Sequence, residues 1–155
     1  MPNTTQSISL ESILTTTHDK MQQLLIILKN EASVLEKNKL EEFDIITQKK
    51  IALTEQIEKN EQLRIHFLKN KSLNPNEPSQ WLQSNKLNSL WSEIKKTSEQ
   101  AQKQNQINGL VINGNRRRVQ TKIEILSSTP IATELTYSAS GENIKQRNSS
   151  ILTHA

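Results

Sequence analysis

Cysteine is absent from these 155 residues, and glycine, proline and aromatic residues are scarce. Without cysteine the chain has no disulfide framework, no thiolate metal site and no cysteine nucleophile. Hydrophobic residues make up 33% and aromatic residues 3%, which is little material for a compact globule around a deep pocket. The longest apolar cluster, Leu24 to Leu28, is far shorter than the roughly 20 residues that a membrane span needs. A narrow apolar stripe on long helices fits this composition better.

Positive charge is in small excess, with a formal net charge of +4. That charge is below the density typical of a dedicated nucleic-acid-binding protein, so we expect no nucleic-acid partner. The amino-terminal residues contain neither a basic leader nor an unbroken apolar run, the two marks of a signal peptide. We therefore expect a cytoplasmic protein without direct membrane insertion.

The few helix breakers divide the chain. No proline or glycine occurs from Asn3 to Asn74, which predicts long helices in this range. Residues on one face recur at alternating steps of four and three from Leu10 to Leu35 and again from Phe43 to Leu68, which is the heptad pattern of a coiled coil. The polar cluster at 36–39 separates the two patterns. We expect the chain to reverse there and to form an antiparallel helical hairpin.

Three polar residues, Lys50, Asn60 and Arg64, interrupt the second heptad pattern. Long polar side chains can cover apolar surface with their stems while their ends stay in water. We expect that arrangement at these three positions, so that the hairpin remains intact despite them.

Pro75 and Pro78 predict a firm break, because each removes a backbone donor and restricts the preceding residue. Ser79 is then a candidate N-cap for a third helix that starts near Gln80. Trp81 and Trp91 are expected to pack against the hairpin; an exposed tryptophan would instead mark a binding hot spot.

One face persists along the third helix. At 100° per residue, ten positions fall within about 60° of one another. Gly109 and Gly114 lie off that face and cost about 1 kcal/mol each relative to alanine, so a joint at either glycine is the rival to a continuous helix. The ten positions are Leu87, Leu90, Ile94, Ala101, Asn105, Asn108, Ile112, Val119, Ile123 and Leu126.

The sequence therefore predicts an all-α fold, an elongated antiparallel coiled-coil-like bundle of about three long helices with a flexible carboxyl-terminal tail. The bundle is expected over 7–127, with a hairpin at 7–70, a break at 71–79 and a long third helix at 80–127. The tail, 128–155, loses helical periodicity and apolar density.

Two groups of residues on the third helix are candidates for contact with another protein. Asn105 and Asn108 lie within the apolar face, where they either fix the register of the bundle or bind backbone groups of a partner chain. A second apolar set points roughly 100° away from that face and needs its own cover: a partner helix, a second copy or solvent. This set consists of Ile107, Leu110, Val111 and Ile125.

The remaining motifs do not indicate catalysis or metal binding. The triplet Arg116–Arg117–Arg118 fans across about 200° of a helix and has no aromatic neighbours to stack on bases, which favours a solvated face or contact with an acidic partner. The three histidines lack metal-ligand spacing, and no phosphate-binding glycine loop occurs. We expect no enzyme activity, no metal and no cofactor.

The ordered combination of features from Leu10 to Gly141 resembles the FlgN family of flagellar type III export chaperones. The Arg triplet and the two Asn-Gly pairs depart from the family pattern. The residues that carry the resemblance are Lys50, Leu53, Arg64, Trp91, Ala101, Asn105, Asn108–Gly109, Leu110, Ile112, the stretch Gln120 to Leu126, and the TYSASG sequence with Tyr137 and Gly141.

The resemblance implies a cytoplasmic chaperone that binds the C-terminal region of hook–filament junction proteins, keeps them unassembled and delivers them to the export apparatus. It implies docking of Tyr137 to the export-gate membrane protein. The chaperone itself would be a monomer or a weak homo-oligomer, and a structural coiled-coil scaffold is the alternative function. The client-binding residues expected from the resemblance and the helical pattern are Asn108, Leu110, Val111, Ile112, Val119, Ile123 and Leu126.

Overall fold

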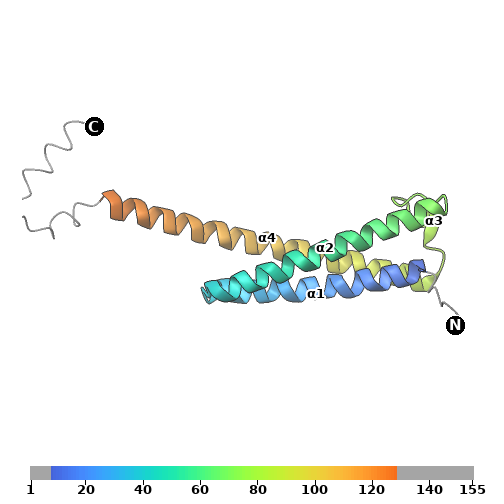
Figure 1. Cartoon of the computed structure of the whole chain (residues 1–155), viewed down its shortest axis with the longest axis horizontal. Helices are drawn as coiled ribbons and strands as arrows, with labels where there is room; N and C mark the ends of the chain where they lie inside the picture. The colour runs from blue at the N-terminus through green and yellow to red at the C-terminus, as the bar shows by residue number, and fades with distance from the viewer. Residues whose placement is uncertain (1–7, 129–155) are drawn as a thin grey trace, which may run out of the picture. The chain divides into compact units, whose positions relative to one another are not determined.

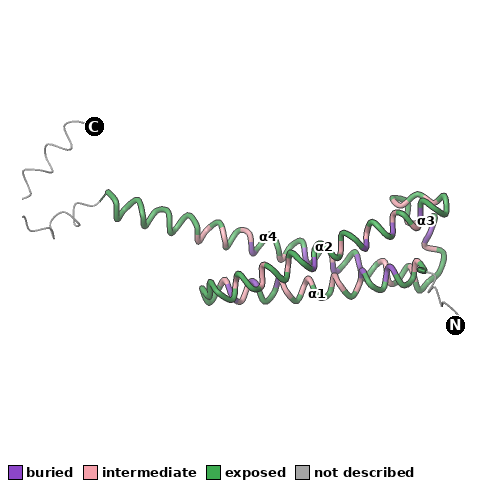
Figure 2. Tube along the Cα trace, viewed as in Figure 1, coloured by how far each residue is buried: buried purple, intermediate pink, exposed green. Residues whose placement is uncertain are grey.

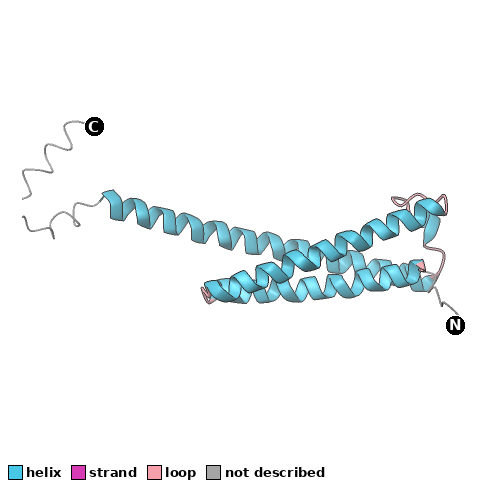
Figure 3. Cartoon of the chain, viewed as in Figure 1, coloured by secondary structure: helices cyan, strands magenta, loops and turns pink. Residues whose placement is uncertain are grey.

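The computed structural model describes residues 8–128, and within this range the secondary structure is helix without strands (Figure 3). The all-α prediction is confirmed. The chain divides into two units, Met1–Ile112 and Asn113–Ala155. Except for Ser128, the predicted tail lies outside the described range. The helices are α1 (Leu10–Glu36), α2 (Leu40–Asn70), α3 (Pro78–Trp81) and α4 (Asn85–Ser128).

Helices α1 and α2 form an antiparallel hairpin in the first unit (Figure 1). A capping box starts α1: Ser9 Oγ accepts a hydrogen bond from Ser12 N at 3.1 Å, and Ser12 Oγ accepts one from Ser9 N at 3.3 Å. At the other end Asn38 has a left-handed backbone, with φ of 54°. The amides of Asn38 and Lys39 donate to the last carbonyls of α1, which closes a Schellman motif and reverses the chain.

The connection from α2 to α4 differs from the prediction of one helix starting near Gln80. Pro78 occupies the first turn of α3, where its missing N–H costs nothing, but this helix ends after one turn at Trp81. The long helix α4 begins only at Asn85. Ser84 Oγ accepts a hydrogen bond from Leu87 N at 3.2 Å, so Ser84 caps α4. The proposed cap at Ser79 was therefore wrong, because that residue lies inside α3.

A hydrophobic core closes the end of the first unit where α2, α3 and the start of α4 meet α1. Trp81 is 3% exposed, and its ring lies edge-on to Trp91, with 5.0 Å between centroids. Both tryptophans pack in this core, as expected. The fully buried members of the cluster are Leu14, Leu68, Trp81 and Ile94.

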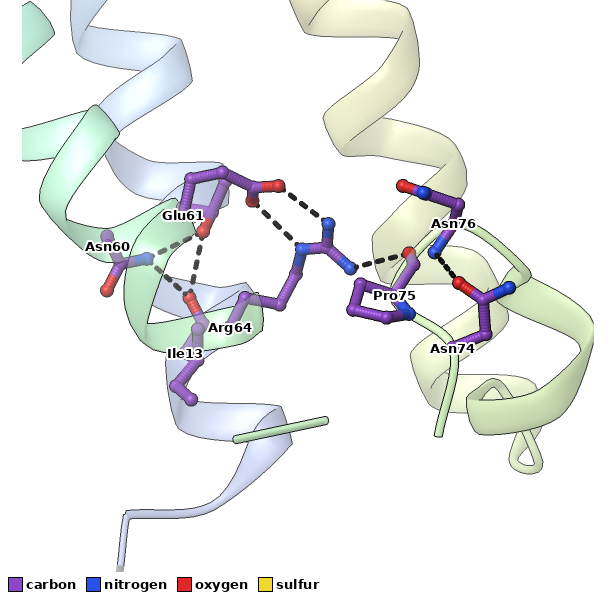
Figure 4. A network of polar contacts seen from close by, with 8 residues as sticks. Ile13, Asn60, Glu61, Arg64, Asn74, Pro75 and Asn76 are labelled. Atoms are coloured by element: carbon purple, nitrogen blue, oxygen red, sulfur yellow. Dashed lines mark hydrogen bonds and ion pairs between the residues drawn. The ribbon is translucent and has the colours of Figure 1, made fainter. Parts of the chain in front are cut away.

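Polar contacts of α2 lie next to this core, and those of Asn60 join α2 to α1 (Figure 4). Asn60 Nδ2 donates to Ile13 O at 2.9 Å and to Thr17 Oγ1 at 2.7 Å. Arg64 is only 5% exposed, and its guanidinium binds Glu61 and the carbonyl of Pro75. The expectation that the polar ends of Asn60 and Arg64 reach water was wrong, because each end finds hydrogen-bond partners inside the bundle.

Candidate functional site

Helix α4 contributes one face to the bundle of the first unit. Ile94, Ala101 and Asn108 follow one another at seven-residue intervals and are all buried. Thr97 is buried on the same face. Ile94, Ala101 and Asn108 belong to the stripe predicted from the sequence, so in the first unit this stripe covers the α1–α2 hairpin.

In the second unit the stripe positions expected from the sequence are exposed. Val119 is 56% exposed, Ile123 55% and Leu126 74%. Every residue from 116 to 128 is exposed (Figure 2). We call Val119, Ile123 and Leu126 the apolar ridge. Helix α4 includes both Gly109 and Gly114.

A second exposed apolar group lies on α4 within the first unit. Leu110 is 72% exposed, and Ile107 and Val111 are exposed to a smaller extent. We call these three residues the side patch. Ile112, another predicted client-binding residue, is half-buried. In the sequence it lies between the side patch and the apolar ridge.

Asn108 differs from the other predicted client-binding residues, because its side chain is used inside the bundle. It is 1% exposed. Its Nδ2 donates to Leu28 O at 2.8 Å and to Glu31 Oε2 at 2.7 Å, and its Oδ1 accepts from Gln104 at 3.0 Å. The contacts with Leu28 and Glu31 fix the register of α4 against α1, whereas the bond from Gln104 lies within α4. We therefore leave Asn108 out of the candidate surface.

Glu31 is a buried partner of Asn108 that was not predicted from the sequence. Its carboxylate is fully buried and also accepts a hydrogen bond from Lys50 Nζ at 2.6 Å. A buried carboxylate needs such a pair of donors to offset its loss of water. The signal in the sequence was a glutamate at a core position of the first heptad pattern, opposite a lysine in the second.

An open groove also lies in the first unit between α1, α2 and α4. Its volume is about 710 Å³, with Met21, Leu24, Leu28 and Ala101 among its apolar lining residues. Asn105, the other asparagine of the stripe, lies at this groove and is exposed. The carboxylates of Glu55 and Glu58 line it as well. The groove was not predicted, because it forms only when α4 packs against the α1–α2 hairpin.

Three further expectations concern Tyr137, metal binding and membrane insertion. Tyr137 lies outside the described residues. Within residues 8–128 no three His, Cys, Asp or Glu side chains form a group that could hold a metal ion. None of the helices in that range is both long and apolar enough to cross a membrane.

A comparison with protein-family models identifies the chain. The FlgN model, described as FlgN protein, matches residues 1–144. The chain belongs to the FlgN family. No curated protein and no solved structure matches it. FlgN proteins are flagellar export chaperones and bind flagellar proteins; they are not a family of enzymes. In this FlgN-family chain the apolar ridge and the side patch are exposed apolar groups of α4.

Proposed function

We propose that this FlgN-family chain is a cytoplasmic chaperone for the C-terminal region of hook–filament junction proteins. It holds them unassembled and delivers them to the type III export apparatus. The observation that supports this most strongly is the exposure of Val119, Ile123 and Leu126, three apolar side chains on one face of the helix in the second unit. A folded protein rarely leaves an ordered apolar face uncovered unless a partner covers it.

The client segment that fits such a ridge is an amphipathic helix. Its apolar side chains would lie against Val119, Ile123 and Leu126 in the way that helices pack into apolar surfaces of their receptors. Leu110, Val111 and Ile112 are proposed as further client-binding residues. At 100° per residue Leu110 lies about 170° and Val111 about 90° from the ridge centre, so these two would contact a different part of the client than the ridge does. Covering the client's apolar face keeps that face from pairing with another subunit.

The expected affinity is moderate. Burial of apolar surface contributes about 25 cal/mol per Å², and the ordering of client and chaperone segments offsets part of that gain. A moderate affinity suits a chaperone, because the complex must come apart at the export apparatus. Release then needs no nucleotide hydrolysis by this chain.

Binding is tested by mixing the full chain with a C-terminal fragment of a junction protein and measuring mass by light scattering. We expect a discrete heterocomplex. Val119→Asp and Ile123→Asp should weaken it, because each places a charge in an apolar contact. Thr121→Asp is the matched control: Thr121 is exposed on the opposite side of the same helix, so this variant should bind normally. Self-assembly without a heterocomplex would favour the scaffold alternative, and normal capture by folded Val119→Asp would refute the proposed surface.

Delivery is proposed to depend on Tyr137, through docking to the export-gate membrane protein. This proposal follows from the family resemblance. Tyr137→Ala should leave the heterocomplex intact and reduce export of the junction protein from cells. A loss of client binding in the purified variant would contradict this separation of roles.

A further inference from the structure

The second unit concentrates the positive charge of the chain. Residues 113–128 hold four cationic side chains (Arg116, Arg117, Arg118 and Lys122) and one carboxylate, Glu124, for a net charge of +3. The whole chain carries +4. A segment of sixteen residues therefore holds most of the excess charge, and it is the segment that carries the apolar ridge.

These cations have no ion-pair partner in the part of the chain that the structure describes. The ion pairs in that part lie in the first unit, where Lys50 pairs with Glu31 and Arg64 with Glu61. Glu124, the only carboxylate of the described second unit, accepts a hydrogen bond from Gln120 instead. Adjacent like charges do not stabilise a helix. No ion pair within the described residues therefore explains why these cations are clustered.

The helical phase places two of the four cations beside the ridge. At 100° per residue, Arg116 lies about 50° to one side of the ridge centre and Lys122 about 65° to the other. Arg118 lies farther round on the Lys122 side, at about 105°. Arg117 points about 150° away from the ridge. The ridge is therefore bordered by positive charge on both sides, and one arginine of the triplet stands apart from it.

We propose that the partner seated on the ridge is an amphipathic helix with carboxylates on both flanks of its apolar face. This inference rests on the proposed function and gives the client its chemical character. Carboxylates on those flanks would pair with Arg116 on one side and with Lys122 and Arg118 on the other. Such pairs set orientation and speed association more than they add affinity.

Two other kinds of anionic partner fit the geometry less well. A phosphate backbone would be bound by Arg117 as readily as by Arg116, and residues 113–128 contain no aromatic side chain to stack on a base. An anionic membrane surface favours a broad apolar face with aromatic residues. The ridge consists of three aliphatic side chains within about 60° of helix surface.

The test uses the full chain and three synthetic peptides with one apolar ladder, flanked by glutamate, glutamine or lysine. We expect the glutamate peptide to bind about tenfold more tightly than the glutamine peptide in 50 mM NaCl, with the difference shrinking as salt screens the charges. The lysine peptide should bind most weakly. Equal binding of the glutamate and lysine peptides would overturn the inference.

Single charge reversals give a matched comparison within the cluster. Arg116→Glu and Lys122→Glu should each weaken binding of the glutamate peptide severalfold, whereas Arg117→Glu should change it by less than about twofold. The double variant Arg116→Glu/Lys122→Glu should prefer the lysine peptide. Circular dichroism checks that each variant is helical. An equal loss with Arg117→Glu would overturn the inference, because long-range charge rather than the flanking position would then govern binding.

The same variants separate this inference from the proposed function and from the other partners. The affinity of a junction-protein fragment could depend on Val119 and Ile123 but not on salt concentration or charge reversal. That result would refute the acidic flanks and leave the chaperone proposal standing. A fragment that fails to bind while the glutamate peptide binds would refute the proposed client and support the acidic flanks. Binding to phosphatidylserine vesicles or to single-stranded RNA that exceeds peptide binding would overturn the inference.

Discussion

The carboxamide of Asn108 donates to the carboxylate of Glu31 over 2.7 Å, although 77 residues separate them in sequence. This contact joins α4 to α1 at a point where both side chains are buried. Lys50 binds the other carboxylate oxygen from α2 at 2.6 Å. One buried charge is therefore shared by all three long helices of the first unit, and it sets the register in which α4 lies on the hairpin.

Asn108→Ala should destabilise the chain by about 2 kcal/mol, because it leaves Glu31 and the carbonyl of Leu28 without this donor. Urea unfolding followed by circular dichroism measures the change. Asn105→Ala is the matched control: Asn105 belongs to the same stripe of α4 but is exposed. Equal destabilisation by both variants would contradict the role assigned to Asn108.

Lys50→Met should also cost about 2 kcal/mol, since the Glu31 carboxylate would stay buried with one donor fewer. Adding Glu31→Gln should restore part of the loss, because the remaining group is neutral. This rescue is the informative measurement, and unfolding of the single and double variants in urea provides it. Lys49→Met, at an exposed position, is the control. A double variant less stable than Lys50→Met would show that the charge is not the cause.

Arg64→Lys should destabilise the tryptophan core by about 2 kcal/mol although it keeps the charge. The Arg64 guanidinium lies 5.1 Å from the ring centroid of Trp81 and 5.3 Å from that of Trp91, and it binds both carboxylate oxygens of Glu61. A lysine ammonium cannot reproduce this planar stacking and paired hydrogen bonding. Tryptophan fluorescence during urea unfolding reports on this site. Arg117→Lys, at an exposed position, should leave stability unchanged, and an equally stable Arg64→Lys protein would refute the argument.

The long helices and the apolar face of α4 could be predicted from the sequence. The absence of proline and glycine before Asn74 and the alternation of four and three residues both follow from local geometry. The expected chain reversal near Asn38 and the burial of Trp81 also depend on nearby residues or on strong general preferences.

The polar contacts inside the bundle could not be predicted in the same way. Asn60 was expected to reach water, but its partners Ile13 and Thr17 lie in another helix, more than forty residues away. Two roles were expected for Asn108, fixing the register of the bundle and binding a client; its contacts fit the first, but its partner Glu31 is brought to it only by folding. The start of α4 was misplaced because Pro78–Trp81 form a separate short helix, and the cap of α4 is Ser84 rather than the expected Ser79.

Gly109→Ala and Gly114→Ala should each stabilise α4 by about 1 kcal/mol, because alanine restricts the unfolded chain and favours helix. A methyl group at either position would meet no heavy atom within 4 Å. Helical content by circular dichroism and amide hydrogen exchange in α4 provide the measurement. Ser98→Gly, inside the same helix, is the reverse control and should destabilise. Loss of stability in Gly109→Ala would show that the helix needs a flexible joint at this position.

Ser72→Gly should stabilise the end of α2 by about 1 kcal/mol. Ser72 has a left-handed backbone with φ of 56°, a conformation that costs an L-residue about 1–2 kcal/mol and glycine almost nothing. The Ser72 amide donates to Lys69 O, and the Leu73 amide donates to Leu68 O, both at 2.9 Å; these are backbone bonds that glycine retains. Urea unfolding of the variant measures the gain, and Ser72→Val should reverse it, because a β-branched side chain tolerates this conformation least. If both variants were equally stable, the left-handed conformation at this helix end would not be what limits stability there.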